Sequence, residues 1–120
     1  MDSCIFCKII KGEVPAEKVI ETENVLAFLD MNPKAKVHVL VIPKKHIESV
    51  KQLEAVDKEL VGEMVLVAKK IAKDLPRQVK AGKNLEGYRL VINVGREGGQ
   101  IVDHLHLHLL SPDIESQLKI

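Results

Sequence analysis

Three of the five histidines in this 120-residue chain alternate with leucine in the run Asp103-His104-Leu105-His106-Leu107-His108-Leu109-Leu110. Successive side chains of a β-strand point to opposite faces, so this spacing predicts a strand with all three histidines on one face and the leucines on the other. The leucine face requires a hydrophobic core. The histidine face indicates a functional site, because imidazole can move protons, attack phosphorus or bind a metal near neutral pH.

The same run could also be a half-buried strand without chemistry, or a metal-binding tract of the kind used as a tag. A tag would be consecutive and terminal. This run instead alternates strictly, is flanked by apolar residues and follows the glycine turn Gly98-Gly99-Gln100. We therefore favour a functional site.

The length and composition fit one soluble globular domain, which we expect to span residues 1–120. Hydrophobic residues make up 46% of the chain, charged residues 29%, and the formal net charge is +1. This balance disfavours disorder and a nucleic-acid partner. The segment Met1-Asp2-Ser3-Cys4 lacks a basic flank and no apolar stretch approaches a membrane span, so we expect no membrane partner and a cytoplasmic location.

Hydrophobic periodicity predicts short strands around one long helix. We expect a short helix or turn over 4–11, a hairpin of strands 18–22 and 25–30, a buried strand over 37–42, a helix over 55–75, a strand over 88–94 and then the histidine strand. The long helix carries an apolar stripe of Val56, Leu60, Val61, Met64, Val65, Ala68, Ile71, Ala72 and Leu75. This order predicts an α+β domain with a mainly antiparallel sheet.

The only two cysteines, Cys4 and Cys7, form a C-x-x-C motif near the N-terminus. They could be a redox pair, half of a zinc site or two buried thiols. No strand precedes them, unlike in a thioredoxin-like pair. A tetrahedral zinc site needs two more ligands, which distant histidines such as His46 and His104 could supply.

The histidine run with its glycine turn resembles the histidine triad (HIT) signature, His-φ-His-φ-His-φ-φ, where φ is apolar. Four further segments, in order, resemble the Hint-like branch of that family, and together they cover nearly the whole chain. They are Cys4-Ile5-Phe6-Cys7-Lys8-Ile9-Ile10, Ala27-Phe28-Leu29-Asp30, His38-Val39-Leu40-Val41-Ile42-Pro43-Lys44-Lys45-His46 and Gly87-Tyr88-Arg89-Leu90-Val91-Ile92-Asn93.

The resemblance implies a HIT-like α+β fold with a five-stranded antiparallel sheet, one long helix and a short N-terminal helix, in a homodimer. It also implies a purine nucleotide site and an enzyme without an organic cofactor. Such an enzyme would hydrolyse purine nucleoside 5′-phosphoramidates or related adenylated compounds at the α-phosphorus. A nucleotidyl-histidine intermediate would form, and water would release AMP or GMP.

By resemblance, His106 is the nucleophile, His38 and His108 flank the phosphoryl group, and Asn93 and Gly99 contact the phosphate or leaving group. A neutral imidazole attacks through one nitrogen only if the other is protonated and held, which a backbone carbonyl can do. Charge that develops on the phosphoryl oxygens needs donors already in place. The Gly99 amide is one candidate donor, whereas His38 alone could equally be an ordinary strand histidine.

The resemblance also assigns residues to the nucleoside. Asp30 matches a ribose-binding acid, although an aspartate at a strand end could also be a turn residue. The apolar walls around the base would be Phe6, Ile10, Ile20, Phe28, Leu29 and Met31.

For the cysteines, the resemblance favours a structural zinc. Zinc-bearing members of the wider superfamily use a terminal C-x-x-C, a histidine after the central strand and the first histidine of the triad run. The matching residues here are Cys4, Cys7, His46 and His104. Four protein ligands make a closed site, which would be structural and not catalytic.

One position departs from the Hint-like pattern. These enzymes commonly have a serine three residues before the first histidine, where this chain has Ile101, which can neither donate nor accept a hydrogen bond. Asp103 has the wrong strand parity to replace the serine. Alternative functions are therefore a catalytically weak nucleotide-binding protein, a dinucleoside polyphosphate hydrolase of the Fhit type, or a zinc-dependent redox protein. His108 favours water as the acceptor, because related transferases typically have glutamine there.

Overall fold

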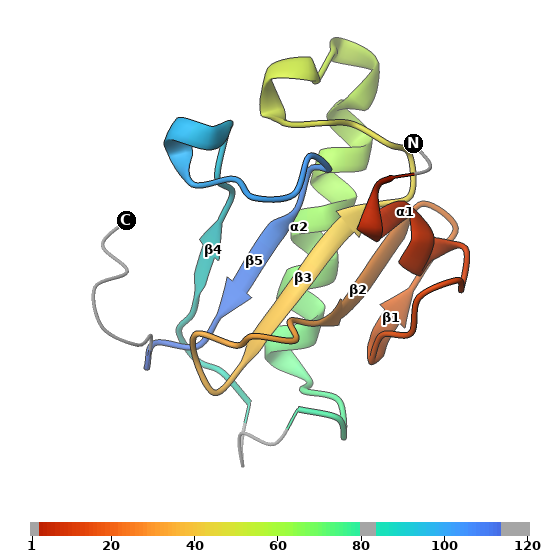
Figure 1. Ribbon diagram of the computed structural model, residues 1–120. Helices are drawn as coiled ribbons and strands as arrows, with labels where there is room; N and C mark the ends of the chain where they lie inside the picture. Colours follow the sequence, from red (N-terminus) through yellow and green to blue (C-terminus); the bar gives the residue numbers. More distant parts are fainter. Residues whose placement is uncertain (1–2, 80–83, 114–120) are drawn as a thin grey trace.

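The computed structural model describes residues 3–79 and 84–113, and it confirms the predicted α+β fold with a five-stranded antiparallel sheet. Within these residues, two α-helices and five strands form the main elements (Figure 1). In chain order they are α1 (Ile5–Ile10), β1 (Lys18–Glu21), β2 (Val25–Leu29), β3 (His38–Pro43), α2 (Lys58–Lys73), β4 (Arg89–Val91) and β5 (Leu107–Leu110).

The strands lie in the order β1-β2-β3-β5-β4, and each neighbouring pair is antiparallel. The histidine strand β5 is therefore inserted between β3 and β4. In this register His108 lies opposite Leu40 of β3 on one side and Val91 of β4 on the other. The last histidine of the run is thus fixed within the sheet by hydrogen-bonded strands on both sides.

The two helices cover opposite faces of the sheet (Figure 1). The α2 face forms the larger core, in which helix residues pack on valines of β2 and β3 and on the leucines of the histidine run. The α1 face forms a smaller cluster around Phe6, Phe28 and Leu40. His38 and His108 share the strand parity of Leu40, so they face the α1 side.

The histidine strand is shorter than the alternation predicts. β5 begins at Leu107, so His104 and His106 lie in the irregular segment before it. In that segment the Leu105 N–H donates to the carbonyl of Ile47 (2.7 Å) and does not join the ladder with β3. The alternation of sides nevertheless persists, because Leu105 joins the α2-side core with the other leucines.

The long helix also differs from its prediction at its start and along its stripe. Residues 55–57 form a 3₁₀ turn, and α2 itself begins at Lys58. Val56 and Val65 are exposed, whereas Val67, which the stripe omitted, is buried. Of the helices in residues 3–79 and 84–113, none has both the length and the apolar character needed to cross a membrane.

Val67 and Val65 offer a matched test of which face of α2 enters the core. We expect Val67→Ala to lower the free energy of unfolding by about 2 kcal/mol, because it removes buried methyl groups. Val65→Ala makes the same chemical change at a side chain that is 41% exposed, against 7% for Val67. We expect it to change stability by less than about 0.5 kcal/mol. Urea unfolding of both variants measures the difference, and equal losses would contradict this orientation of the helix.

Candidate active site

A cavity of about 440 Å³ opens on the α1 side of the sheet, over the ends of β2, β3 and β5. It brings together most of the residues that the sequence assigned to a nucleotide site. These are Phe6, Phe28, Asp30, Met31, His38, Asn93, Gly99, His106 and His108. Residues from widely separated segments of the chain therefore meet at one place.

Three predicted wall residues, Ile10, Ile20 and Leu29, do not line this cavity. Leu29 and Ile20 pack against the α2-side core, because Leu29 has the opposite strand parity to Phe28. Ile10 packs against the α1-side cluster without reaching the cavity.

Different apolar residues complete the walls instead, and regular spacing would have found several of them. Ile5 and Ile9 are four residues apart on α1 and so share one face of the helix. Leu40 and Leu110 each lie two residues beyond a histidine of the site on the same strand. The remaining apolar lining comes from Ala16, Val91, Ile101 and Val102.

His106 is buried, and its ring is held in one orientation. Its Nδ1–H donates to the carbonyl of His104 at 2.6 Å, which leaves Nε2 with a free lone pair. The Phe6 ring packs edge-on against the imidazole, with ring centroids 5.2 Å apart. Burial lowers the pKa of His106, although the hydrogen bond to His104 opposes this. The ring is therefore neutral near pH 7, as a nitrogen nucleophile must be.

His38 and His108 form a hydrogen-bonded pair whose tautomers follow from their neighbours. The Lys34 N–H donates to His38 Nδ1 (3.0 Å), so in the neutral ring the proton is on Nε2. That Nε2–H lies 2.9 Å from His108 Nδ1 and 3.3 Å from Asp30 Oδ2. His108 Nδ1 accepts, and its own proton must therefore be on Nε2.

The resulting Nε2–H of His108 is buried, and no group among residues 3–79 and 84–113 accepts its hydrogen bond. A buried donor without a partner costs free energy, which an acceptor from a ligand can recover. Burial, with smaller contributions from the charges of His106 and His38, lowers the pKa of His108 to about 4, although Asp30 opposes this. His108 is thus a neutral donor in the wall of the cavity.

Gly99 supports the site in a different way from the prediction. Its N–H donates to the carbonyl of Arg96 (3.0 Å) and is not free for a phosphate. Its φ of +92° lies in the left-handed region that favours glycine, and an added Cβ would contact the Asn93 side chain. Gly99 therefore permits a tight turn beside Asn93 and does not supply the predicted amide donor.

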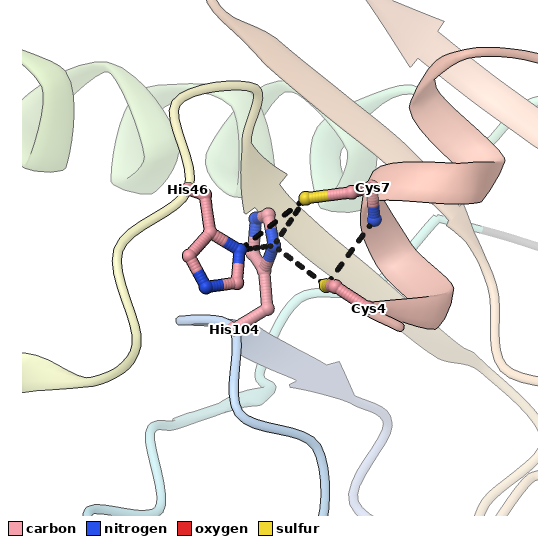
Figure 2. Close-up of side chains that lie close together, drawn as sticks. All are labelled: Cys4, Cys7, His46 and His104. Carbon is pink, nitrogen blue, oxygen red and sulfur yellow. Dashed lines mark hydrogen bonds between the residues drawn. The ribbon is translucent and has the colours of Figure 1, made fainter. Parts of the chain in front are cut away.

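The four predicted metal ligands Cys4, Cys7, His46 and His104 converge next to this cavity (Figure 2). Cys4 Sγ lies 3.3 Å from His104 Nδ1, Cys7 Sγ lies 3.3 Å from His46 Nδ1, and the two Nδ1 atoms are 3.2 Å apart. Tetrahedral zinc with bonds of about 2.0–2.3 Å places its ligands roughly 3.3–3.8 Å apart. The donor set and its spacing therefore fit zinc.

The surroundings of His104 also fit a metal ligand. The ring is fully buried, and its Nε2–H donates to the carbonyl of Pro43 (2.8 Å), which leaves Nδ1 unprotonated toward the cysteines. Metal-bound histidines typically donate their other N–H in this way. The Cys7 N–H in turn donates to Cys4 Sγ at 3.3 Å.

Asp30, His38 and His108 also lie close enough to hold a metal, but their neighbours oppose it. A metal on His38 Nε2 would require the proton on Nδ1, where the Lys34 N–H already points. This trio therefore fits a chain of hydrogen bonds better than a metal site.

A five-stranded antiparallel sheet that carries the run His104-Leu105-His106-Leu107-His108, with His106 and His108 in the cavity, is typical of the class of histidine triad proteins. The HIT domain family model matches residues 11–114. The chain is 44% identical over 108 residues to adenosine 5′-monophosphoramidase HNT1 of Candida albicans. This alignment covers 90% of this chain and 69% of that protein. The chain belongs to the HIT family.

Two solved structures agree with this assignment. A HIT family hydrolase from Legionella pneumophila is 47% identical with a TM-score of 0.81, over 92% of this chain and 93% of that one. A zinc-bound histidine triad family protein from Mycobacterium smegmatis is 34% identical with a TM-score of 0.79, over 99% of this chain and 81% of that one.

Proposed function

We propose that this protein hydrolyses purine nucleoside 5′-phosphoramidates, or related adenylated compounds, and releases AMP or GMP. The observation that carries the proposal is the pair of fixed tautomers. His106 presents a lone pair on Nε2, and His108 presents an unpartnered Nε2–H in the same cavity. A nucleophile beside a donor suits attack on a phosphoryl group. The similarity to a relative named as an adenosine 5′-monophosphoramidase also supports it.

The reaction would proceed in two displacements at the α-phosphorus. First, His106 Nε2 forms a bond to phosphorus while the P–N bond breaks, and the departing nitrogen takes up a proton from solvent water and leaves as an amine. A water molecule then attacks the phosphorus, releases a proton to solvent, and displaces His106, so that the nucleoside monophosphate is released. The His108 Nε2–H would donate to a phosphoryl oxygen, and Asp30 would accept from the ribose hydroxyls.

The direct test is to incubate the purified protein with adenosine 5′-phosphoramidate and to follow AMP release. Sustained release would support the hydrolase. If a folded protein that binds AMP releases none, the runner-up function, nucleotide binding without significant turnover, takes its place. Ile101 favours that alternative, because it provides no hydrogen bond to the leaving nitrogen. Diadenosine polyphosphates assayed in parallel would detect the Fhit-type activity.

The reaction should tolerate mild acid. Protonation of His106 removes its lone pair, and burial places its pKa below the usual 6.5. We therefore expect kcat/KM to fall to half of its plateau value only at a pH below 6.5. At still lower pH the decrease should approach about tenfold per unit. A pH profile checks this, with the acid-catalysed background subtracted. A half-maximal rate at or above pH 6.5 would contradict it.

We further propose a structural zinc on Cys4, Cys7, His46 and His104. When bound, zinc would hold α1 to the segments at His46 and His104.

We also propose that the protein is cytoplasmic and forms a homodimer. β4 is an edge strand of the sheet, which leaves it able to pair with a second copy.

A further inference from the structure

Ile101 is an exposed apolar side chain at the mouth of the nucleotide cavity. It is 80% exposed, yet it lines the same cavity as His106, His108 and Gly99. With Ile5 and Val102 it also lines a neighbouring cavity of about 460 Å³. These three apolar residues therefore form a shared wall between the two cavities, which we call the apolar rim.

The loop that carries Ile101 is held firmly. The Arg96 guanidinium donates to the carbonyls of Gln100 (2.9 Å) and Ile101, and it pairs with Asp103 (3.0 Å). The Gln100 amide donates to the carbonyls of Glu48 (2.6 Å) and Val102 (2.9 Å). The backbone at Ile101 is thus held in place, so contact with a ligand there needs little ordering beyond that of the side chain.

The place of the rim in the cavity indicates which part of a substrate it meets. Phe28 and Asp30 lie at the end of β2, where the base and ribose are proposed to bind, while His106 and His108 would hold the phosphorus. β2 and β5 run parallel, because each is antiparallel to β3, so Ile101, in the loop before β5, lies toward the opposite end of the sheet from Asp30. The group attached to the phosphorus on the side away from the ribose is the leaving group.

We propose that the apolar rim selects phosphoramidates whose leaving amine carries a branched or extended apolar group. This inference rests on the proposed function and names its substrate class. When the P–N bond breaks, the amine departs with its added proton past Ile101. Covering an exposed isoleucine with an apolar group removes apolar surface from water, whereas a polar leaving group gains no hydrogen bond from it.

The test compares kcat/KM for the unsubstituted adenosine 5′-phosphoramidate and for its N-methyl, N-propyl and N-isopentyl derivatives. The three alkylamines have nearly the same basicity, so the intrinsic reactivity of the P–N bond stays matched while the apolar area grows. We expect the wild type to prefer the isopentyl over the methyl compound by about tenfold. Ile101→Ser should reduce this preference to about twofold or less, and Ile101→Val should retain most of it.

Two measurements keep the test specific. Val56→Ser removes an equally exposed apolar side chain outside both cavities, and it should leave the preference unchanged. Inhibition by AMP, which lacks a leaving group, should respond to Ile101→Ser by less than about twofold. A flat alkyl series in an active wild type, or an undiminished preference in Ile101→Ser, would overturn the inference alone. Failure to hydrolyse even the unsubstituted compound would overturn the proposed function and this inference together.

Discussion

His106→Ala should abolish hydrolysis of adenosine 5′-phosphoramidate, with kcat falling by about four orders of magnitude or more. The variant lacks the imidazole whose lone pair is held toward the cavity by a backbone hydrogen bond. AMP should still bind within about threefold of the wild type, because the remaining walls and the His108 donor persist. Initial rates and AMP titration by calorimetry measure the two effects separately.

Two further variants distinguish the nucleophile from the hydrogen-bond donor beside it. In His106→Asn the side-chain amide can still donate to the His104 carbonyl, yet it cannot attack phosphorus, so this variant should be as inactive as His106→Ala. His108→Leu removes the Nε2–H donor and should cost about a hundredfold. Wild type and His108→Leu quenched in alkaline denaturant should both carry an AMP adduct on the peptide containing His106, because the P–N bond of such an adduct is labile in acid. An adduct mapped elsewhere, or more than about one percent of activity in His106→Ala, would contradict the assignment.

Replacing both Cys4 and Cys7 by serine should produce the largest loss of stability. We expect the wild type to bind one zinc ion per chain and the double variant to bind none. Because metal binding couples to folding, the variant should lose at least about 4 kcal/mol and melt about 15 °C lower. Zinc content by atomic absorption and thermal unfolding by circular dichroism are the measurements.

Glu48→Gln is a suitable control for the cysteine variants. Glu48 is exposed beside Cys4 and His46 in the neighbouring cavity, but it is not among the clustered ligands. It should leave zinc content and melting temperature unchanged. Treating the wild type with a chelator should reproduce the loss seen in the double variant. If the wild type bound no zinc when supplied with it, or the double variant melted like the control, the zinc proposal would be wrong.

The sequence predicted most of this architecture because two periodicities were strong. Alternation placed Leu105, Leu107 and Leu109 in one core, and helical spacing predicted α2. The start of β5 was not predictable from alternation, because Leu105 pairs with Ile47 outside the sheet. That contact depends on tertiary packing, which local pattern does not encode.

The residues of the site were predicted about as well as the fold, and the errors have similar causes. Residues with distinctive chemistry, such as His38 and Asp30, meet in the cavity as the family resemblance implied. Apolar wall residues were harder to assign, because Leu29 and Phe28 are chemically alike and only strand parity separates them. The hydrogen bond from the Gly99 N–H to the Arg96 carbonyl depends on the geometry of the loop, and so do the hydrogen bonds of the Arg96 side chain. The sequence of the loop does not reveal this geometry.

The shortness of α1 has a consequence for how the protein handles its ligand. A helix of six residues is not stable in isolation, so α1 persists only while its contacts hold it on the sheet. Those contacts are the packing of Phe6 and Ile9 and the cluster at Cys4 and Cys7. Local opening of α1 would remove one wall of the cavity without unfolding the sheet. The apparent nucleotide affinity would then scale with the fraction of chains in which α1 is docked, and binding of the proposed zinc would raise that fraction.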